Sequence, residues 1–319
     1  MRDGADSVVS GPQRVGPGLL PANTRSGIGG WLAFALRINQ EALLRVFISV
    51  DMEGTAGVVD WPACVGDGPE AMAGRELLLG EVNAAIDGAV RAGATDILVN
   101  DGHAMMRNLA ADRVHGDATV ISGWHRPDDM MEGIDESFDA ALLVSYHGSM
   151  GHARSNMSHS FNPRAVSEVL LNGAVVGESV INSLVAAHYG VPVVLVTGDD
   201  AGCEETVEVL PHVTTAVVKR SITRHAAASV HPRRARELIA EAAERSVAGR
   251  SSVPAHPFPT PSTLTVTWRT PDMADMASWV RGVDRSGPRT TTITHSDLLT
   301  LYRCFIAAIT VTRVVAEDV

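Results

Sequence analysis

From residue 45 onward, hydrophobic positions alternate between short continuous runs and longer stretches with helical spacing. The short runs are rich in β-branched residues and predict buried strands over 46–50, 97–100, 140–146 and 193–197. The longer stretches predict helices over 69–92, 178–189 and 231–247. Because strands that alternate with helices usually pair in parallel through crossovers, the pattern predicts an α/β fold with a mostly parallel sheet and flanking helices.

The composition and the periodicity of the sequence change at both ends of this region. Residues 1–44 hold Gly, Pro, Ser and Arg with little periodicity, which predicts a flexible N-terminal extension. Prolines between 254 and 261 mark a linker, after which a strand over 264–268, a helix near 272–280 and a final helix after residue 295 predict a smaller α+β portion. The expected organisation is an extension over 1–44, an α/β domain over 45–253, and a C-terminal portion over 254–319 packed on it.

Composition and charge narrow the class of protein. Hydrophobic residues make up 45% and charged residues 20%, as is ordinary for a soluble globular chain. The formal net charge of −11 argues against nucleic acid as a partner, because phosphate binding needs a basic face. No apolar run approaches the ~20 residues of a membrane span, so no membrane partner is expected. Three separated cysteines without a Cys-x-x-Cys motif indicate free thiols, and we expect a cytoplasmic protein.

Potential metal ligands follow the predicted strands at the point where each strand ends. They are Asp51 and Glu53 after the first strand, Asp101 and His103 after the second, His147 after the third, and Glu178 at the start of the next helix. In an open α/β sheet, ligands bind beyond the carboxyl ends of the strands, so these side chains should converge. Side chains two positions apart on extended chain share a face, which lets Asp51 and Glu53, and likewise Asp101 and His103, serve one site. Mixed carboxylate and imidazole ligands suit Zn²⁺, and this set suffices for two ions about 3.5–4 Å apart.

Each of these residues also has a purely structural interpretation. An aspartate at a strand end is often a helix N-cap or a turn former, and Glu178 suits the first turn of a helix. For Asp199 and Asp200, which follow the fourth strand, we favour the cap and turn interpretation over a second metal pair. The joint placement of the others at strand ends favours a metal site. A loop histidine, His159 or His152, is then positioned to act as acid, base or nucleophile, and the spacing leaves both open.

Six stretches between about residue 45 and the C-terminus occur in the order, and near the spacings, of a known family. They are Ser49-Val50-Asp51-Met52-Glu53-Gly54, Val99-Asn100-Asp101-Gly102-His103, Tyr146-His147, Met157-Ser158-His159-Ser160, Val176-Gly177-Glu178 and Val196-Thr197-Gly198-Asp199-Asp200. Together they resemble the D-aminopeptidases of the dipeptide-permease operon type, the M55 metallopeptidases. The combination of stretches is specific, whereas any single stretch is not.

The resemblance implies a two-zinc aminopeptidase that releases D-amino acids from the amino end of short peptides such as D-Ala-D-Ala. The zinc ligands that it implies are Asp51, Glu53, His103, His147 and Glu178. It implies that His159 is the catalytic nucleophile or base. It also implies a homo-oligomer, a decamer of two stacked pentamers whose active sites face an inner channel.

Two features depart from the family pattern. Residues 1–44 have no counterpart in it, and the loop from His147 to His159 is about one residue longer and begins differently, with Gly148-Ser149-Met150-Gly151-His152. The preference for D- or L-peptides therefore stays open. Two alternatives remain: a related metallohydrolase acting on L-peptides or amides, and a non-catalytic oligomeric peptide-binding protein. A dinucleotide-binding fold is not expected, because no Gly-x-Gly-x-x-Gly follows the first strand.

Overall fold

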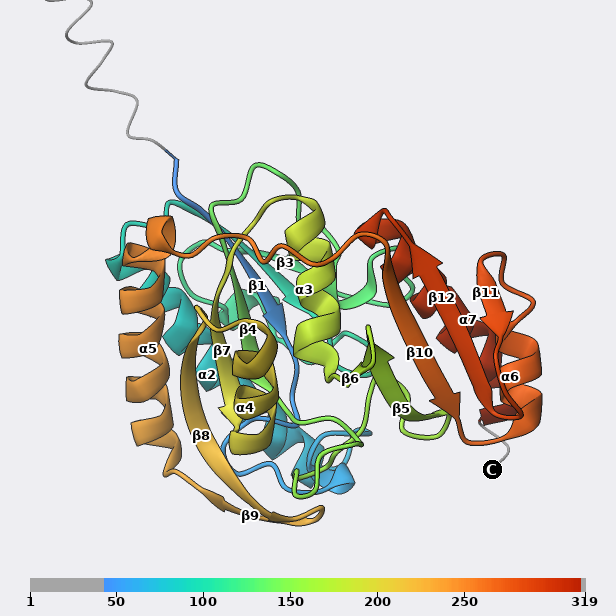
Figure 1. Cartoon of the computed structure of the whole chain (residues 1–319). Helices are drawn as coiled ribbons and strands as arrows, with labels where there is room; N and C mark the ends of the chain where they lie inside the picture. Colours follow the sequence, from blue (N-terminus) through green and yellow to red (C-terminus); the bar gives the residue numbers. More distant parts are fainter. Residues whose placement is uncertain (1–42, 317–319) are drawn as a thin grey trace, which may run out of the picture. The chain divides into compact units, whose positions relative to one another are not determined.

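The computed structural model describes residues 43–316, and its centre is a seven-stranded sheet in the order β3-β2-β1-β4-β7-β8-β9 (Figure 1). The strands are β1 (Arg45–Val50), β2 (Asp96–Asp101), β3 (Thr119–Ile121), β4 (Ala140–Tyr146), β7 (Val193–Asp199), β8 (Thr214–Thr223) and β9 (Ala226–Ser229). All neighbours pair in parallel except β8 and β9, which form an antiparallel hairpin at one edge. The prediction of an α/β fold with a mostly parallel sheet is confirmed.

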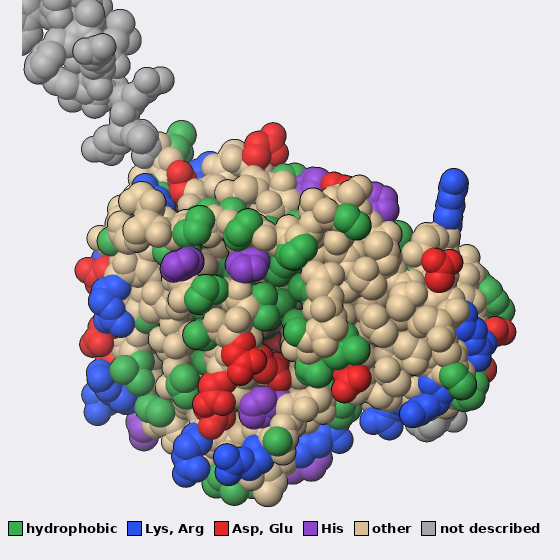
Figure 2. Space-filling model, in the orientation of Figure 1, with side chains coloured by type: hydrophobic (Ala, Val, Ile, Leu, Met, Phe, Trp, Pro, Cys, Tyr) green, Lys and Arg blue, Asp and Glu red, His purple; other side chains and the backbone are tan. Residues whose placement is uncertain are grey.

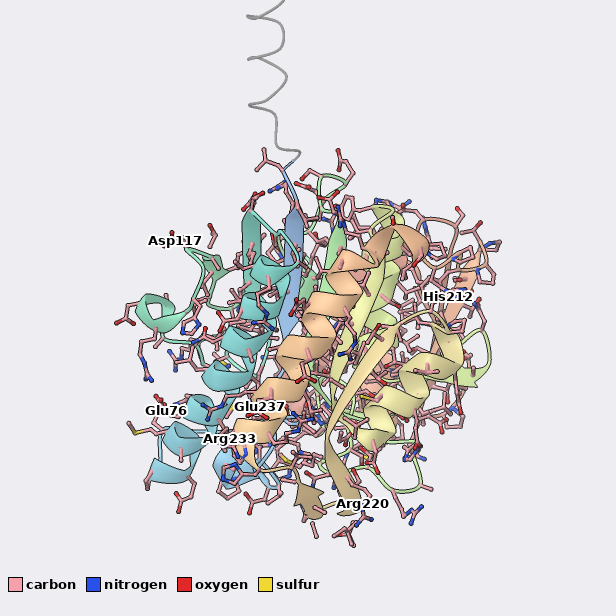
Figure 3. All side chains as sticks on the ribbon, turned by 90° about the vertical axis from the view of Figure 1, so that its left-hand side faces the viewer. Glu76, Asp117, His212, Arg220, Arg233 and Glu237 are labelled. Atoms are coloured by element: carbon pink, nitrogen blue, oxygen red, sulfur yellow. The ribbon has the colours of Figure 1, made fainter. Side chains whose placement is uncertain are left out.

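Helices cover both faces of this sheet. They are α2 (Pro69–Arg91) and α5 (Pro232–Ala248) on one face, and α3 (Glu178–His188) and α4 (Asp200–Val209) on the other (Figure 1). Because both faces are covered, the central strands are apolar along their length, and all seven residues of β4 and of β7 are buried. The outer side of α5 is polar instead, where Arg233 and Glu237 form an i,i+4 ion pair of 2.8 Å (Figure 3).

A second, antiparallel sheet has five strands in the order β11-β12-β10-β5-β6. Its strands are β5 (Val166–Leu171), β6 (Ala174–Val175), β10 (Ser262–Trp268), β11 (Val283–Arg285) and β12 (Thr290–His295), and α6 (Pro271–Ala277) and α7 (Leu298–Ala316) pack on it. The β5–β6 hairpin turns at Asn172 and Gly173, both with positive φ, as two-residue hairpin loops require. Strands β5 and β6 precede the predicted boundary between residues 253 and 254, and strands β10, β11 and β12 follow it. The division of the chain into two parts at this boundary stays a prediction.

Several elements differ from the sequence-based expectation. The helix expected near 272–280 ends at Ala277, and the final helix begins at Leu298. The elements that were not predicted are strands β3, β5, β6, β8, β9, β11 and β12, helix α4, and the short 3-10 helices η1 (Trp61–Ala63), η2 (Ala111–Arg113), η3 (Asp129–Met131) and η4 (Arg250–Ser252). The predicted flexible extension over 1–44 lies outside the described residues except for its last two positions.

Helix α7 shows that one expectation is wrong, namely that no apolar segment of the chain approaches the length of a membrane span. It has 19 residues, and an 18-residue window within it has a mean hydropathy of 1.6. By length and composition it could cross a membrane, although no run of that length was expected. However, α7 buries an apolar face against α3, α6 and strands β10 and β12. Its Arg303 also pairs with Asp128 at 2.6 Å. These contacts are typical of a core helix that covers a sheet.

Side chains of both charges are mixed over the face drawn in Figure 2. Acidic side chains gather over α4, which carries the exposed Glu204 and Glu208, and basic side chains lie along the side where α5 packs. These basic side chains are arginines, because the only lysine of the chain, Lys219, is buried. This face has no continuous basic surface of the kind that binds nucleic acid.

Candidate active site

The ends of three neighbouring strands bring the predicted ligands into one buried cluster. The five side chains are Asp51 and Glu53 after β1, His103 after β2, His147 after β4, and Glu178 at the first position of α3. Each is at most 5% exposed. Because β2, β1 and β4 are adjacent and parallel, their carboxyl ends meet at one edge of the sheet. The structure therefore assembles the five residues as the strand pattern predicted.

Asp51 lies at the centre of this cluster, between two imidazole rings. Its Oδ1 is 3.4 Å from His103 Nδ1, and its Oδ2 is 3.4 Å from His147 Nε2. Glu53 Oε2 lies 2.8 Å from the same His103 nitrogen, and Glu178 Oε1 lies 3.4 Å from the same His147 nitrogen. The cluster therefore has two halves, each with one imidazole and one glutamate, joined by the two oxygens of Asp51.

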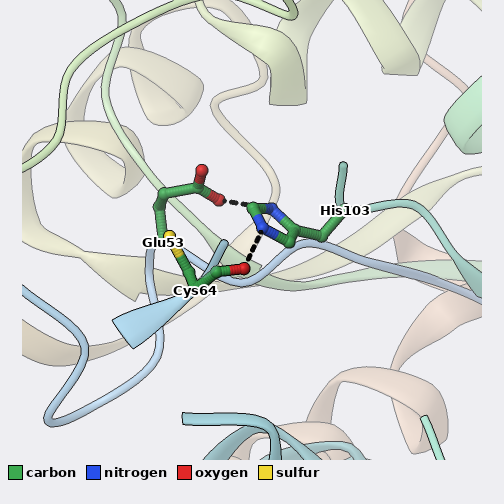
Figure 4. A group of neighbouring side chains, drawn as sticks. All are labelled: Glu53, Cys64 and His103. Carbon is green, nitrogen blue, oxygen red and sulfur yellow. Dashed lines mark hydrogen bonds and ion pairs between the residues drawn. The ribbon is translucent and has the colours of Figure 1, made fainter. Parts of the chain in front are cut away.

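Backbone carbonyls fix the orientation of both rings. His103 Nε2 lies 3.0 Å from Cys64 O (Figure 4), and His147 Nδ1 lies 2.9 Å from Gly148 O. A carbonyl oxygen only accepts hydrogen bonds, so these nitrogens are assigned as the N–H donors. The other nitrogen of each ring faces the carboxylates, where a bound cation would take the place of its proton. Histidine ligands of metals are commonly held in this way, with the second ring nitrogen bonded to a carbonyl or carboxylate.

The electrostatics of the cluster fit a bound cation. Asp51 Oδ2 and His147 Nε2 are buried and have no hydrogen-bond partner among the described residues. Burial and the neighbouring charge of Glu53 raise the pKa of Asp51. Burial favours a lower pKa for His147, but the charges of Glu178 and Asp51 outweigh it and raise that pKa well above its usual value. Carboxylates packed this closely favour positive charge between them, and carboxylate with imidazole is a donor set that suits zinc.

His159 stands over the cluster, whereas His152 does not. The His159 ring stacks on His147 with 4.3 Å between centroids, and its Nε2 lies 3.6 Å from Glu178 Oε1. Its Nδ1 lies 2.9 Å from Met157 O, so Nε2 carries the lone pair. Burial and the positive charge of His147 lower the pKa of His159 to about 4. His152 is partly exposed, its Nδ1 accepts from Arg154 N at 3.2 Å, and its Nε2 lies 3.9 Å from Glu204. Of the two loop histidines, geometry therefore favours His159 as the proton acceptor.

Three further aspartates serve the loops and caps around the site. The Asp101 carboxylate accepts hydrogen bonds from the side chain of Asn108 and from Leu109 N, both at 2.9 Å. Its expected pairing with His103 as a second ligand is therefore wrong, because the loop after β2 occupies its oxygens. Asp199 is the N-cap of α4 and accepts from Gly202 N at 2.7 Å, and Asp200 accepts from Ser221 N at 2.8 Å. The cap interpretation of Asp199 is confirmed, whereas Asp200 is the first residue of α4 and connects that helix to β8.

Beneath the cluster lie two buried ionisable residues that the sequence analysis missed. Lys219 donates from its ammonium group to the backbone oxygens of Glu53 and Val58, and burial lowers its pKa to about 8. Glu81 accepts from Ala56 N at 2.9 Å and from Ser145 at 2.8 Å, and burial raises its pKa to about 7. Both residues hold the turn that follows β1. A single lysine in the whole chain, placed within an apolar strand, was the signal available.

Gly54 belongs to the same turn, where a side chain would collide with the neighbouring strand. A Cβ atom at this position would lie 2.0 Å from Tyr146 O and 2.5 Å from Ser145 O, on the neighbouring strand β4. Gly54 N also donates to Ser145 O at 2.8 Å. The close approach of the two backbones places Glu53 beside the end of β4, and thus beside His147.

A cavity of about 570 Å³ opens over the cluster. Its base includes Asp51, Glu53, His103, His159 and Glu178. Its walls are apolar and cationic: they include Trp61, Trp124, Phe161, Ile306 and Ile309, together with Arg164, Arg224, Arg269 and Arg313. A space of this size admits a short peptide, and its polarity suits a ligand with both apolar and anionic groups.

Comparison with known proteins places the chain in a family. The family model for D-aminopeptidases, peptidase family M55, matches residues 44–307. The chain belongs to this family. It is 33% identical over 264 residues to a D-aminopeptidase of Bacillus subtilis (strain 168), with 82% of this chain and 96% of the relative covered. Family membership confirms the predicted class of enzyme, a hydrolase that acts on peptide bonds.

A solved structure agrees with this assignment. The Zn-dependent D-aminopeptidase DppA from Bacillus subtilis, described as a self-compartmentalizing protease, superposes with a TM-score of 0.81. The two sequences are 31% identical, and the superposition covers 85% of this chain and 98% of that one. The fold of residues 43–316 is therefore the fold of that enzyme.

Proposed function

We propose that this protein is a two-zinc aminopeptidase that removes the N-terminal residue from short peptides containing D-amino acids, such as D-Ala-D-Ala. The observation that carries the proposal is the placement of Asp51, whose two oxygens face His103 and His147 separately. The Zn-dependence and D-aminopeptidase activity stated for the similar DppA support the choice of metal and substrate.

The ligands divide between two ions. Glu53 and His103 would hold one ion, His147 and Glu178 would hold the other, and Asp51 would bridge them. The buried, unpartnered Asp51 Oδ2 and His147 Nε2 suit this assignment. When bound, zinc supplies Lewis acidity, which polarises a peptide carbonyl and makes water more acidic.

His159 would move the proton in this reaction. Its Nε2 faces Glu53 and Glu178 at 3.8 and 3.6 Å, so it lies over the cluster with its lone pair directed inward. Nε2 carries this lone pair because Nδ1 is bonded to Met157 O, so His159 can accept a proton from the attacking water. It can then return that proton to the leaving amine. Stacking on His147 and the bond from Nδ1 to Met157 O keep the ring in this orientation.

The arginines of the cavity wall would bind the far end of the substrate. Among the described residues, no ion pair engages Arg164 or Arg269. Arg224 already donates to Ser158 O at 3.1 Å, which supports the loop that carries His159. Guanidinium groups bind carboxylates strongly, so we propose that Arg164 and Arg269 bind the C-terminal carboxylate of a short peptide. A peptide anchored at both ends is limited in length by the cavity.

We also propose a homo-oligomer, specifically a decamer, that works in the cytoplasm. The description of DppA as self-compartmentalizing supports assembly. Trp279 is 71% exposed and Val314 is 71% exposed, and such large apolar side chains are candidates for contacts between subunits. The three cysteines are free thiols, which suits a reducing compartment. The native mass from analytical ultracentrifugation tests the assembly: a mass of one or two chains contradicts it.

Metal analysis and a substrate panel test the proposed activity. We expect two zinc ions per chain, loss of activity on chelation, recovery with Zn²⁺, and faster hydrolysis of D-Ala-D-Ala than of L-Ala-L-Ala. Asp51→Ala should lose both metal and activity. Fewer than one transition-metal ion per normally folded chain would sink the proposal. Faster hydrolysis of the L-peptide would favour the alternative metallohydrolase, and metal binding without turnover would favour a peptide-binding protein.

A further inference from the structure

The loop that follows β1 brings a cysteine beside two of the proposed metal ligands. Cys64 directly follows η1, and only 1% of it is exposed. One ligand atom from each of Glu53, Cys64 and His103 lies within 4.8 Å of the other two (Figure 4). A sulfur, an imidazole nitrogen and a carboxylate oxygen therefore share one small buried volume.

Cys64 is held in place by its backbone, and its sulfur has weak contacts within its own turn and with the His103 side chain. The sulfur lies 3.8 Å from Asp60 O and 3.7 Å from Trp61 O, both in its own turn, and S–H is a weak donor. The carbonyl oxygen of Cys64 accepts from His103 Nε2 at 3.0 Å, which turns Nδ1 of that ring toward Glu53. The same residue thus orients the imidazole and places a thiol near it.

A second observation points to a cation at this place. Glu53 Oε2 is a buried atom without a hydrogen-bond partner among the described residues, and it lies 2.8 Å from the His103 nitrogen that faces the cluster. Glu53 is only 1% exposed. Buried carboxylate oxygens of this kind are costly unless a positive charge lies between them. A divalent ion bound near Glu53 and His103 meets that need, and Cys64 then lies within reach of it.

We propose that Cys64 is a further ligand, beside Asp51, Glu53 and His103, of the metal ion on that side of the cluster. The inference rests on the proposed function, because it concerns one of the two proposed ions. Zn²⁺ binds thiolate, imidazole and carboxylate ligands in combination. Coordination replaces the S–H bond with a sulfur–metal bond and releases the proton to solvent.

The proposed ligation makes the two ions unequal. The other two groups, one of His147, His159 and Glu178 and one of Asp51, Glu53 and His147, offer nitrogen and oxygen atoms alone. Soft thiolate ligands favour zinc over harder divalent ions such as Mg²⁺ and Mn²⁺. The ion beside Cys64 therefore binds first and leaves last, and the ion beside His147 exchanges more readily.

Cobalt substitution of the full chain tests this ligation without any activity measurement. Metal-free wild type titrated with Co²⁺ should develop the near-ultraviolet charge-transfer absorption of a cobalt–thiolate bond with its first equivalent. Cys64→Ser should lack this absorption, and its tighter zinc site should weaken by at least about tenfold. Cys203→Ala is the matched control, because Cys203 is also buried but its sulfur lies near Val196 O, away from the cluster. It should behave as wild type.

X-ray absorption of the zinc-loaded wild type is a second measurement that needs no variant. A sulfur neighbour at about 2.3 Å from zinc supports the ligation, and a shell of nitrogen and oxygen alone overturns it. Two bound cobalt ions without the sulfur absorption, or the same absorption in Cys64→Ser, also overturn it while leaving the proposed two-metal peptidase intact. A wild type that binds no cobalt or zinc overturns both proposals.

Discussion

Replacing Lys219 with methionine tests whether a buried amine holds the turn that carries Glu53. Lys219 is fully buried, and its ammonium group donates to the backbone oxygens of Glu53 and Val58, the second at 2.7 Å. Methionine has a similar length but no donor. Both oxygens would lose this partner, and the turn after β1 would lose its connection to strand β8.

Two energies of similar size oppose each other in this substitution. A buried acceptor left without its donor costs about 1–3 kcal/mol, so two of them cost about 2–6 kcal/mol. Burial lowers the pKa of Lys219 from 10.5 to about 8, which corresponds to about 3 kcal/mol that the buried ammonium costs at neutral pH and methionine does not. We therefore expect the free energy of unfolding to change by less than about 3 kcal/mol. Activity should fall about 100-fold, because a shift of about 1 Å in a catalytic group has an effect of that size.

The assay combines urea unfolding with steady-state hydrolysis of D-Ala p-nitroanilide by the zinc-loaded variant. Arg220→Met is the matched control, because Arg220 is the next residue, is exposed (Figure 3), and carries the same charge. The control should match wild type in both measurements. Activity of Lys219→Met within threefold of wild type would refute the reasoning. A stability loss large enough to unfold the variant in the assay would refute the expected balance of energies.

Four further substitutions address single features of the site. His159→Ala should keep both zinc ions by metal analysis and lose kcat by about 10²–10⁴-fold, and an unchanged kcat would exclude His159 as the proton carrier. In the fold, burial raises the pKa of Glu81 from 4.5 to about 7, so the protonated form stabilises the protein below pH 4.5 and this contribution is lost as the pH rises through 7. As the pH rises from 4.5 to 7, the free energy of unfolding of wild type, measured in urea, should fall by up to about 3 kcal/mol relative to that of Glu81→Gln. A difference between the two proteins that does not change with pH would contradict this prediction. Gly54→Ala should reduce stability by about 1–3 kcal/mol in thermal unfolding, because its Cβ would lie 2.0 Å from Tyr146 O. Arg164→Ala should raise KM for D-Ala-D-Ala by about tenfold but not for the dipeptide amide, and equal changes for both would exclude a carboxylate contact.

The parallel sheet and the cluster at its edge could be read from the sequence, because both depend on local patterns. Continuous apolar runs identified β1, β2, β4 and β7, and in parallel strands the residues that follow each run meet at one edge. That rule is enough to bring Asp51, His103 and His147 together. It could not separate Asp101 from the cluster, because the donors that occupy Asp101 come from a loop whose path the pattern does not determine.

The residues that support the cluster were missed for a related reason. Cys64 and Glu81 reach the site from a loop and from the interior of helix α2, so only tertiary contacts reveal them. The β5–β6 hairpin was missed although a signal was present. Asn172-Gly173 between two short apolar segments is typical of a two-residue hairpin loop, and both residues have the positive φ that this turn requires.

The second sheet sets a time at which the catalytic cluster can form. Strand β5 lies between His159 and Glu178 in the sequence, yet its long partner β10 begins at Ser262. Synthesis runs from the N-terminus at about 5–20 residues per second, so all five proposed ligands leave the ribosome seconds before β10 does. Until then β5 has only β6 beside it, and an isolated two-stranded hairpin is marginally stable. We therefore expect a nascent chain to gain hydrolytic activity only after β10 has emerged, when the segment from His159 to Glu178 is held in place.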